Sequence, residues 1–203
     1  MRVIGGSSRG RRLQAPATGA TRPTSDRVRE AIFDILGSLI ELEGASAVDL
    51  FAGSGALGIE ALSRGAASAV FVEQHGEAVS CIRANLAATG LGPAEVVRAD
   101  VLSWLRRLQP ARRFDVALAD PPYAFDAWAV LLEQLPARLA VLESSSPVIC
   151  PPPWKVLKEK RYGGTLVTVI RSALPPAHDL LVDHSVAGAV ASGGGTGQQK
   201  GSP

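Results

Sequence analysis

The sequence predicts an α/β fold in which a doubly wound, mainly parallel sheet is closed by an antiparallel hairpin. From Ala45 onward, short apolar runs alternate with helix-like segments, a pattern typical of a parallel sheet with helices on both faces. The last two strand-like runs are joined by Gly163-Gly164, a two-residue hairpin signature. At 203 residues the chain is long enough for one well-cored domain.

The expected elements follow from apolar periodicity and from turn residues between the apolar runs. A small β-hairpin is expected within residues 2–15, followed by a helix capped by Thr24 or Ser25. Parallel strands are expected at 46–52, 67–73, 94–101, 114–120 and 140–144. Helices are expected at 55–64, 76–89, 102–109 and 126–139. The closing hairpin is expected at 154–162 and 165–171.

The chain divides into three parts with different charge and composition. Residues 1–22 form an extension, 23–172 the main domain, and 173–203 a Gly-rich tail that we expect to be disordered. Residues 1–30 carry a net charge of +5, whereas the whole chain carries +2, so the remainder is mildly acidic. This asymmetry suggests a polyanionic partner, although charge alone is equally compatible with a surface that merely lacks acids.

Cysteine, histidine and hydropathy patterns exclude several classes of protein. Cys81 and Cys150 are far apart, and the histidines at 75, 178 and 184 do not cluster, so neither a zinc site nor a disulfide framework is expected. The sequence has no 18-residue apolar run and no signal-peptide pattern. We therefore expect a cytoplasmic monomer that needs no metal and no membrane.

A glycine-rich loop follows the first strand and opens a helix. Gly53, Gly55 and Gly58 satisfy G-x-G-x-x-G, the dinucleotide fingerprint, and Glu73 follows where a carboxylate would hold ribose, so an NAD-dependent oxidoreductase is one interpretation. Asp49, however, would sit poorly beside a pyrophosphate. It suits a cofactor with a cationic end, such as S-adenosylmethionine (SAM).

Acidic residues are predicted at the ends of four successive strands: Asp49, Glu73, Asp100 and Asp120. Because parallel strands end at one edge of the sheet, these acids should form a rim there. Glu73 would bind the ribose of SAM and Asp100 its adenine amine. The candidate cofactor-binding residues are Asp49, Ala52, Gly53, Ser54, Gly55, Glu73, Asp100 and Val101.

The candidate catalytic residues are Asp120, Pro121, Pro122 and Tyr123, which end the fourth strand. The prolines stop strand pairing, so the carbonyls of Asp120 and Pro121 are left without sheet partners. The Asp120 carboxylate and the Pro121 carbonyl are the two expected acceptors. Such acceptors could hold the exocyclic amine of a nucleobase, and Tyr123 offers a face for stacking. The motif does not specify the base, and a plain turn after a strand is the structural alternative.

The sequence resembles the bacterial RsmD family, the 16S rRNA guanine-N2 methyltransferases. The shared segments are 2–6, 22–30, 49–58, 60–64 and 120–123, within about residues 1–172. The resemblance implies a seven-stranded SAM-dependent methyltransferase fold with an N-terminal β-hairpin extension that binds RNA. It implies a guanine of 16S rRNA in an assembling 30S particle as substrate. The candidate RNA-binding residues are Arg9, Arg11, Arg12, Arg22, Thr24 and Arg27.

Two departures and several alternatives accompany this resemblance. Relatives often have Glu-x-Asp where this chain has Glu73-Gln74-His75, and the tail after Ser172 has no recognised counterpart. A DNA or RNA adenine-N6 methyltransferase would share the amine-binding chemistry. A non-catalytic RNA-binding module on the same fold is a further alternative, as is the NAD-dependent oxidoreductase.

Overall fold

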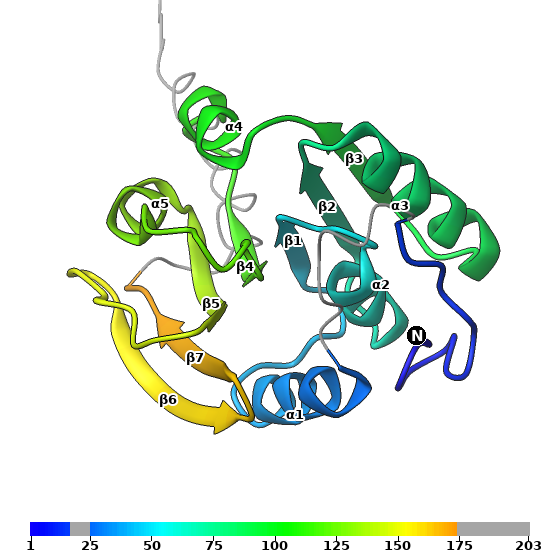
Figure 1. Ribbon diagram of the computed structural model, residues 1–203, viewed down its shortest axis with the longest axis horizontal. Helices are drawn as coiled ribbons and strands as arrows, with labels where there is room; N and C mark the ends of the chain where they lie inside the picture. The colour runs from blue at the N-terminus through cyan, green and yellow to red at the C-terminus, as the bar shows by residue number, and fades with distance from the viewer. Residues whose placement is uncertain (17–24, 174–203) are drawn as a thin grey trace, which may run out of the picture.

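The computed structural model describes residues 1–16 and 25–173, which are built around one seven-stranded sheet (Figure 1). Its strand order is β3-β2-β1-β4-β5-β7-β6. The strands are β1 (Ser46–Leu50), β2 (Ser68–Glu73), β3 (Ala94–Arg98), β4 (Phe114–Ala119), β5 (Ala137–Ser144), β6 (Lys155–Tyr162) and β7 (Thr165–Arg171). β1 to β5 pair in parallel, whereas β7 is antiparallel to both β5 and β6. The predicted fold class, including the Gly163-Gly164 hairpin, is confirmed.

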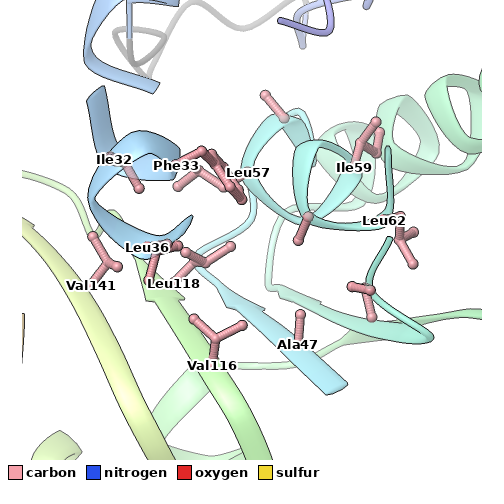
Figure 2. Close-up of a cluster of buried hydrophobic side chains, with 14 of the residues drawn as sticks. Ile32, Phe33, Leu36, Ala47, Leu57, Ile59, Leu62, Val116, Leu118 and Val141 are labelled. Atoms are coloured by element: carbon pink, nitrogen blue, oxygen red, sulfur yellow. The ribbon is translucent and has the colours of Figure 1, made fainter. Parts of the chain in front are cut away.

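In the described part of the chain, five helices cover the two faces of the sheet. They are α1 (Asp26–Gly37), α2 (Ala56–Ser63), α3 (Gly76–Thr89), α4 (Val101–Arg107) and α5 (Trp128–Gln134). α1, α2 and α3 contribute to one apolar cluster, and α4 and α5 contribute to another (Figure 1). In Figure 2, Phe33 and Leu36 of α1 lie against Leu57 of α2 and Leu118 of β4. The sheet is therefore buried on both faces, as parallel strands require.

The start of α1 agrees with the sequence prediction. Ser25 is the N-cap residue, and its hydroxyl accepts from the Val28 amide at 3.3 Å. The apolar side chains at 28, 32, 33, 35 and 36 are buried, so one face of α1 packs on the sheet. Thr24, the other predicted cap, lies outside the described residues.

Three predicted boundaries were wrong for physical reasons. The helix expected at 126–139 ends at Gln134, because Pro136 disfavours helical backbone at Leu135 and cannot donate to a helical carbonyl. β5 then begins at Ala137 instead of residue 140. The strand expected at 94–101 ends at Arg98, because Asp100 is the N-cap of α4 and accepts from the Ser103 amide.

Residues 1–16, here called the N-terminal arm, form a hairpin only in outline. One isolated antiparallel bridge joins Arg2 and Arg12, and the Val3 amide donates to the Arg11 carbonyl at 2.9 Å. Gly5 to Gly10 form turns and bends, because the glycines favour left-handed backbone at Gly6 and Gly10. The proposed boundary at residue 22 and the tail from 174 to 203 lie outside the described residues.

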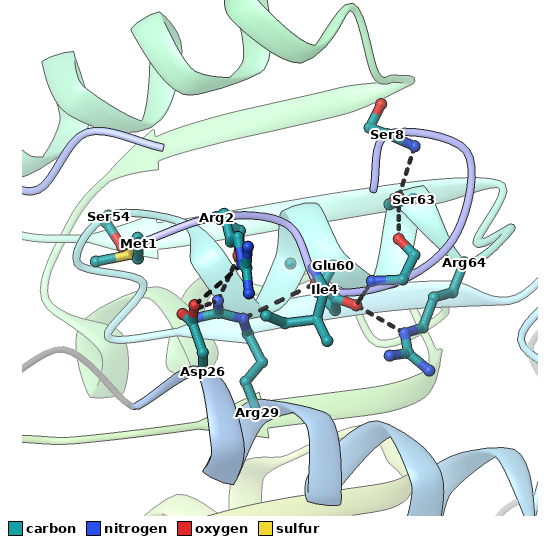
Figure 3. A network of polar contacts seen from close by, with 12 residues as sticks. Met1, Arg2, Ile4, Ser8, Asp26, Arg29, Ser54, Glu60, Ser63 and Arg64 are labelled. Carbon is teal, nitrogen blue, oxygen red and sulfur yellow. Dashed lines mark hydrogen bonds and ion pairs between the residues drawn. The ribbon is translucent and has the colours of Figure 1, made fainter. Parts of the chain in front are cut away.

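A buried polar network fastens the arm to α1 and α2 (Figure 3). The Glu60 carboxylate of α2 accepts from the Ile4 and Gly5 amides, each at 2.8 Å. Arg29 of α1, which is fully buried, donates to the Arg2 carbonyl at 2.6 Å and lies 3.9 Å from Glu60. The arm thus has a fixed position on the domain.

No helix within residues 1–16 and 25–173 is long and apolar enough to cross a membrane. The same residues contain no cluster of three or more His, Cys, Asp or Glu side chains that could hold a metal ion.

Candidate active site

The glycine loop between β1 and α2 has an unusual backbone. Phe51, Gly53 and Gly55 all have positive φ, at 60°, 55° and 78°. Left-handed backbone is costly for phenylalanine, so neighbouring contacts must hold the loop in this form. The Ala52 amide donates to the Val72 carbonyl at 3.1 Å, and the Gly53 amide donates to Glu73 at 2.9 Å. β2 therefore supports the loop from one side.

Glu73 at the end of β2 has both carboxylate oxygens engaged with backbone. Oε2 accepts from Gly53, and Oε1 accepts from the His75 amide at 2.8 Å. Its side chain is buried, so its first role in the structure is to shape the loop. The ribose contact predicted for Glu73 stays a prediction.

Asp49 lies behind the loop with 1% of its surface exposed. Its Oδ2 accepts from the Gly58 amide in the first turn of α2 at 2.8 Å. Burial raises the pKa of Asp49 well above its ordinary value, and the nearby Asp120 and Glu73 carboxylates raise it further, against the lowering effect of the Gly58 bond. Three of the four predicted acids are thus gathered at one place.

The Asp-Pro-Pro-Tyr segment directly follows β4, as predicted, and enters a turn in which the Phe125 amide donates to the Pro122 carbonyl at 2.8 Å. Tyr123 projects into solvent with 66% of its surface exposed. The Phe125 ring contacts Phe51 of the glycine loop edge-on, with centroids 5.0 Å apart. This aromatic contact fixes the segment relative to the loop.

The remaining cofactor candidates lie near this edge in different environments. Ala52 is buried under the loop, and Ser54 is half-buried. Asp100 is exposed, and its bond with Ser103 lowers the pKa of the carboxyl. Val101 is buried in the first turn of α4. Their contacts with a cofactor stay predictions.

Four of the arginines predicted to bind RNA lie on the described surface. Arg9, Arg11, Arg12 and Arg27 are all exposed, so all four can reach solvent, as phosphate contacts require. Arg9 and Arg27 line one cavity of about 270 Å³ between the arm and α1, so the structure brings these two together. Arg22 and Thr24 lie outside the described residues.

The residues that position these groups were not predicted from the sequence. Glu60 and Arg29 anchor the arm, and Asn85 of α3 contacts both the arm and the glycine loop. The buried position of Glu60 could have been predicted from the sequence, because it lies within the otherwise apolar helix Ala56–Ser63 and a buried carboxylate needs hydrogen-bond partners. No comparable pattern marks Asn85.

Comparison with known proteins decides the family. Residues 1–171 match the family described as "Conserved hypothetical protein 95". The chain belongs to this family, the RsmD family. The predicted resemblance is therefore confirmed over the arm, the sheet and the closing hairpin.

Named relatives and a solved structure agree with this assignment. The chain is 42% identical over 123 residues to Ribosomal RNA small subunit methyltransferase D of Escherichia coli K12, covering 61% of this chain and 60% of that protein. The protein of the same name from Haemophilus influenzae is 36% identical, over 80% of this chain and 89% of the relative. A hypothetical protein of Thermus thermophilus superposes with a TM-score of 0.74 at 35% identity, covering 84% of this chain and 99% of that structure.

Proposed function

We propose that this RsmD-family protein transfers a methyl group from SAM to the exocyclic N2 amine of a guanine in 16S rRNA, within an assembling 30S subunit. The observation that supports the proposal is that Asp120, which follows β4, lies close enough to Asp49 to raise its pKa, because an amine acceptor at Asp120 would then be near the expected donor site. The names of the relatives support rRNA as substrate. The family resemblance supports guanine N2, and a ribosomal substrate implies a cytoplasmic protein.

The residues of the site fit a cationic cofactor. Asp49, Glu73 and Asp120 concentrate negative charge at the carboxyl edge of the sheet, and the raised pKa of Asp49 reflects their proximity as well as its burial. A sulfonium and an ammonium would neutralise this charge, whereas a pyrophosphate would add to it. SAM supplies, when bound, an electrophilic methyl group on its sulfonium.

The chain's own groups act on the acceptor amine. The lone pair of a base amine is delocalised into the ring, which makes the amine a poor nucleophile. Hydrogen bonds from the two amine hydrogens to the Asp120 carboxylate and the Pro121 carbonyl favour a tetrahedral nitrogen with a localised lone pair. During methyl transfer these acceptors would stabilise the positive charge that develops on the amine nitrogen. Tyr123, being exposed, can stack on an unpaired guanine.

Labelling with tritiated SAM tests the proposal. The protein is incubated separately with 30S particles, naked 16S rRNA and DNA, and the labelled nucleosides are then identified. N2-methylguanosine from the 30S particles or the rRNA is expected. Recovery of N6-methyladenosine instead would refute the guanine assignment.

Calorimetry separates the proposal from its more distant alternatives. SAM should bind, and NAD should not, because the acidic edge disfavours a pyrophosphate. Tight binding of NAD without binding of SAM would favour the oxidoreductase. Binding of RNA without any methyl transfer would favour a non-catalytic module.

A further inference from the structure

Asn85 on α3 joins two parts of the molecule that are far apart in sequence. It is 1% exposed, and its side-chain oxygen accepts from the Gln14 amide of the N-terminal arm at 2.8 Å. Its side-chain nitrogen donates to the Gln14 carbonyl at 3.0 Å and to the Ser54 carbonyl of the glycine loop at 2.9 Å. One amide group therefore pairs with the arm as a strand would and holds the loop at the same time.

The loop needs this support because its backbone is not relaxed. Three of its residues, Phe51, Gly53 and Gly55, have positive φ, and Phe51 lacks the freedom of a glycine. Glu73 holds the loop at the Gly53 amide, and Asn85 holds it one residue later, at the Ser54 carbonyl. Removing the Asn85 amide would leave the Ser54 carbonyl without this donor.

The arm reaches the loop at a second point. The Ser54 hydroxyl donates to the Met1 sulfur at 3.3 Å, and Figure 3 shows these two side chains side by side. Bonds from the Val3 amide to Arg11 and from the Leu13 amide to Met1 tie the two ends of the arm together. The segment carrying the exposed arginines at 9, 11 and 12 lies between these ends, so its position depends on the same contacts.

We propose that Asn85 is a positioning residue that couples the N-terminal arm to the glycine loop, so that cofactor binding and rRNA binding strengthen each other. This inference rests on the proposed function, since it takes the loop as the SAM site and the arm as an rRNA contact. Ordering of the loop by the cofactor favours the Ser54 geometry that Asn85 contacts, and hence the docked arm. By thermodynamic linkage, an arm held by rRNA favours the cofactor-ready loop to the same extent.

The experiment measures this coupling in the full-length protein. Dissociation constants for isolated 30S particles are determined with and without saturating S-adenosylhomocysteine, and their ratio is the coupling factor. We expect a factor of at least about 5 in the wild type, at the lower end of typical allosteric couplings. Asn85→Ala should reduce it to about 1 and should also weaken S-adenosylhomocysteine binding.

Ser63→Ala is the matched control. The Ser63 hydroxyl accepts from the Ser8 amide at 3.0 Å and donates to the Gly5 carbonyl at 2.6 Å, both in the arm. This variant should weaken 30S binding while the coupling factor stays at the wild-type value. A merely structural contribution of Asn85 would lower both affinities and leave their ratio unchanged, and that outcome would overturn the inference.

Gln14→Pro keeps the test valid if Asn85→Ala does not fold. Proline removes the Gln14 amide proton from the exposed arm and leaves Asn85 in place for Ser54. The coupling factor should fall towards 1, while cofactor affinity without 30S particles stays within about twofold of the wild type. A wild-type factor of 1 would overturn the coupling alone, whereas a wild type that binds both ligands without transferring methyl groups would refute the proposed function.

Discussion

Asp120 is the residue on which the proposed chemistry depends most directly. It follows the last residue of β4, so a buried strand fixes its backbone, while the prolines after it prevent further strand pairing. Its carboxylate is close enough to Asp49 to raise the pKa of that group. The proposed acceptor for the amine and the buried charge behind the glycine loop therefore belong to one electrostatic site.

Asp120→Ala should abolish methyl transfer while SAM binding persists. Loss of one preorganised group that stabilises a transition-state charge typically lowers the rate by about 10²- to 10³-fold. We expect a fall of this size in tritium transfer to 30S particles, with the SAM dissociation constant from calorimetry within about threefold of the wild type. Asp126, which lies a few residues further along the chain, is the control, and Asp126→Ala should leave both values unchanged. Equal loss of binding and transfer in Asp120→Ala would place Asp120 in the cofactor site.

Asp49→Asn should weaken SAM binding about tenfold, or ~1.4 kcal/mol, because the negative charge facing the cationic cofactor is lost. An asparagine oxygen can still accept from the Gly58 amide, so the loop should persist. Calorimetry from acidic to neutral pH should show wild-type affinity rising as Asp49 ionises, at a pH above the ordinary value of 3.8. If SAM affinity of Asp49→Asn depended on pH in the same way as that of the wild type, this role of Asp49 would be contradicted.

Without cofactor, ionisation of Asp49 should lower the free energy of unfolding, whereas it should raise the affinity for SAM. Because burial raises the pKa of Asp49, the folded protein retains a proton that the unfolded chain has released. The free energy of unfolding should therefore decrease as the pH rises from the ordinary value of about 3.8 through the raised one. Urea unfolding at several pH values should show this decrease in the wild type and its reduction in Asp49→Asn.

At the level of residues, the sequence predicts which side chains lie close together, but not which hydrogen bonds they make. The carboxyl ends of neighbouring parallel strands share an edge, so Asp49, Glu73 and Asp120 could be placed together without coordinates. Which oxygen of Glu73 binds which amide depends on the conformation of the glycine loop, which no local pattern specifies. Asn85 could not be found, because its partners are 31 and 71 positions away in the chain.

Among the elements, α2 links the core to the cofactor loop. Gly55 is its N-cap, and Gly58 lies so close to β2 that an added Cβ would be 2.4 Å from a Phe71 ring carbon. Phe71 is fully buried in the core, so its ring could move aside only by displacing its neighbours. The third glycine of the fingerprint is thus explained by close helix–strand packing, as in dinucleotide-binding folds.

Gly58→Ala should destabilise the protein by about 1–3 kcal/mol, the usual cost of overpacking a core. Gly37→Ala is the matched control, because Gly37 also lies in a helix but an added Cβ there would meet nothing within 4 Å. Helix propensity alone would make both changes stabilising by up to about 1 kcal/mol. Urea unfolding should therefore give opposite signs for the two variants, and SAM affinity should fall only in Gly58→Ala. The same sign for both would contradict the packing argument.

A helix or strand can be predicted from the sequence when its own residue pattern determines it, and not when it depends on tertiary contacts. β1, β2 and β4 were identified from apolar runs, and α1 from its cap and periodicity, because burial on a sheet imposes those patterns. The end of α5 was missed although Pro136 marks it, because apolar residues at similar spacing continue on both sides of the proline. The arm was predicted as a small β-hairpin, and one antiparallel bridge, Arg2–Arg12, is present, but its position is held mainly by contacts with Glu60 and Arg29.

For binding to RNA, the distribution of charge over the whole molecule matters more than its small net charge. The exposed arginines of the N-terminal arm lie beside different helices: Arg9 lines the cavity next to α1, and Arg11 donates to the Ala88 carbonyl at the end of α3. β6, at the far edge of the sheet, carries exposed lysines at 155, 158 and 160. Lysines on an edge strand discourage pairing with other chains, which explains them without RNA.

These two basic surfaces allow a charge-matched test of the RNA interface. Replacing Arg9, Arg11 and Arg12 by alanine should weaken 30S binding, and the slope of log affinity against log salt should become shallower by about 2 if each arginine neutralises one phosphate. Replacing Lys155, Lys158 and Lys160 by alanine removes the same net charge and should leave this slope nearly unchanged. Titrations at several salt concentrations measure both slopes. Equal changes in the two variants would mean that net charge alone drives binding, and an unchanged slope in the arginine variant would mean that the arm does not contact RNA.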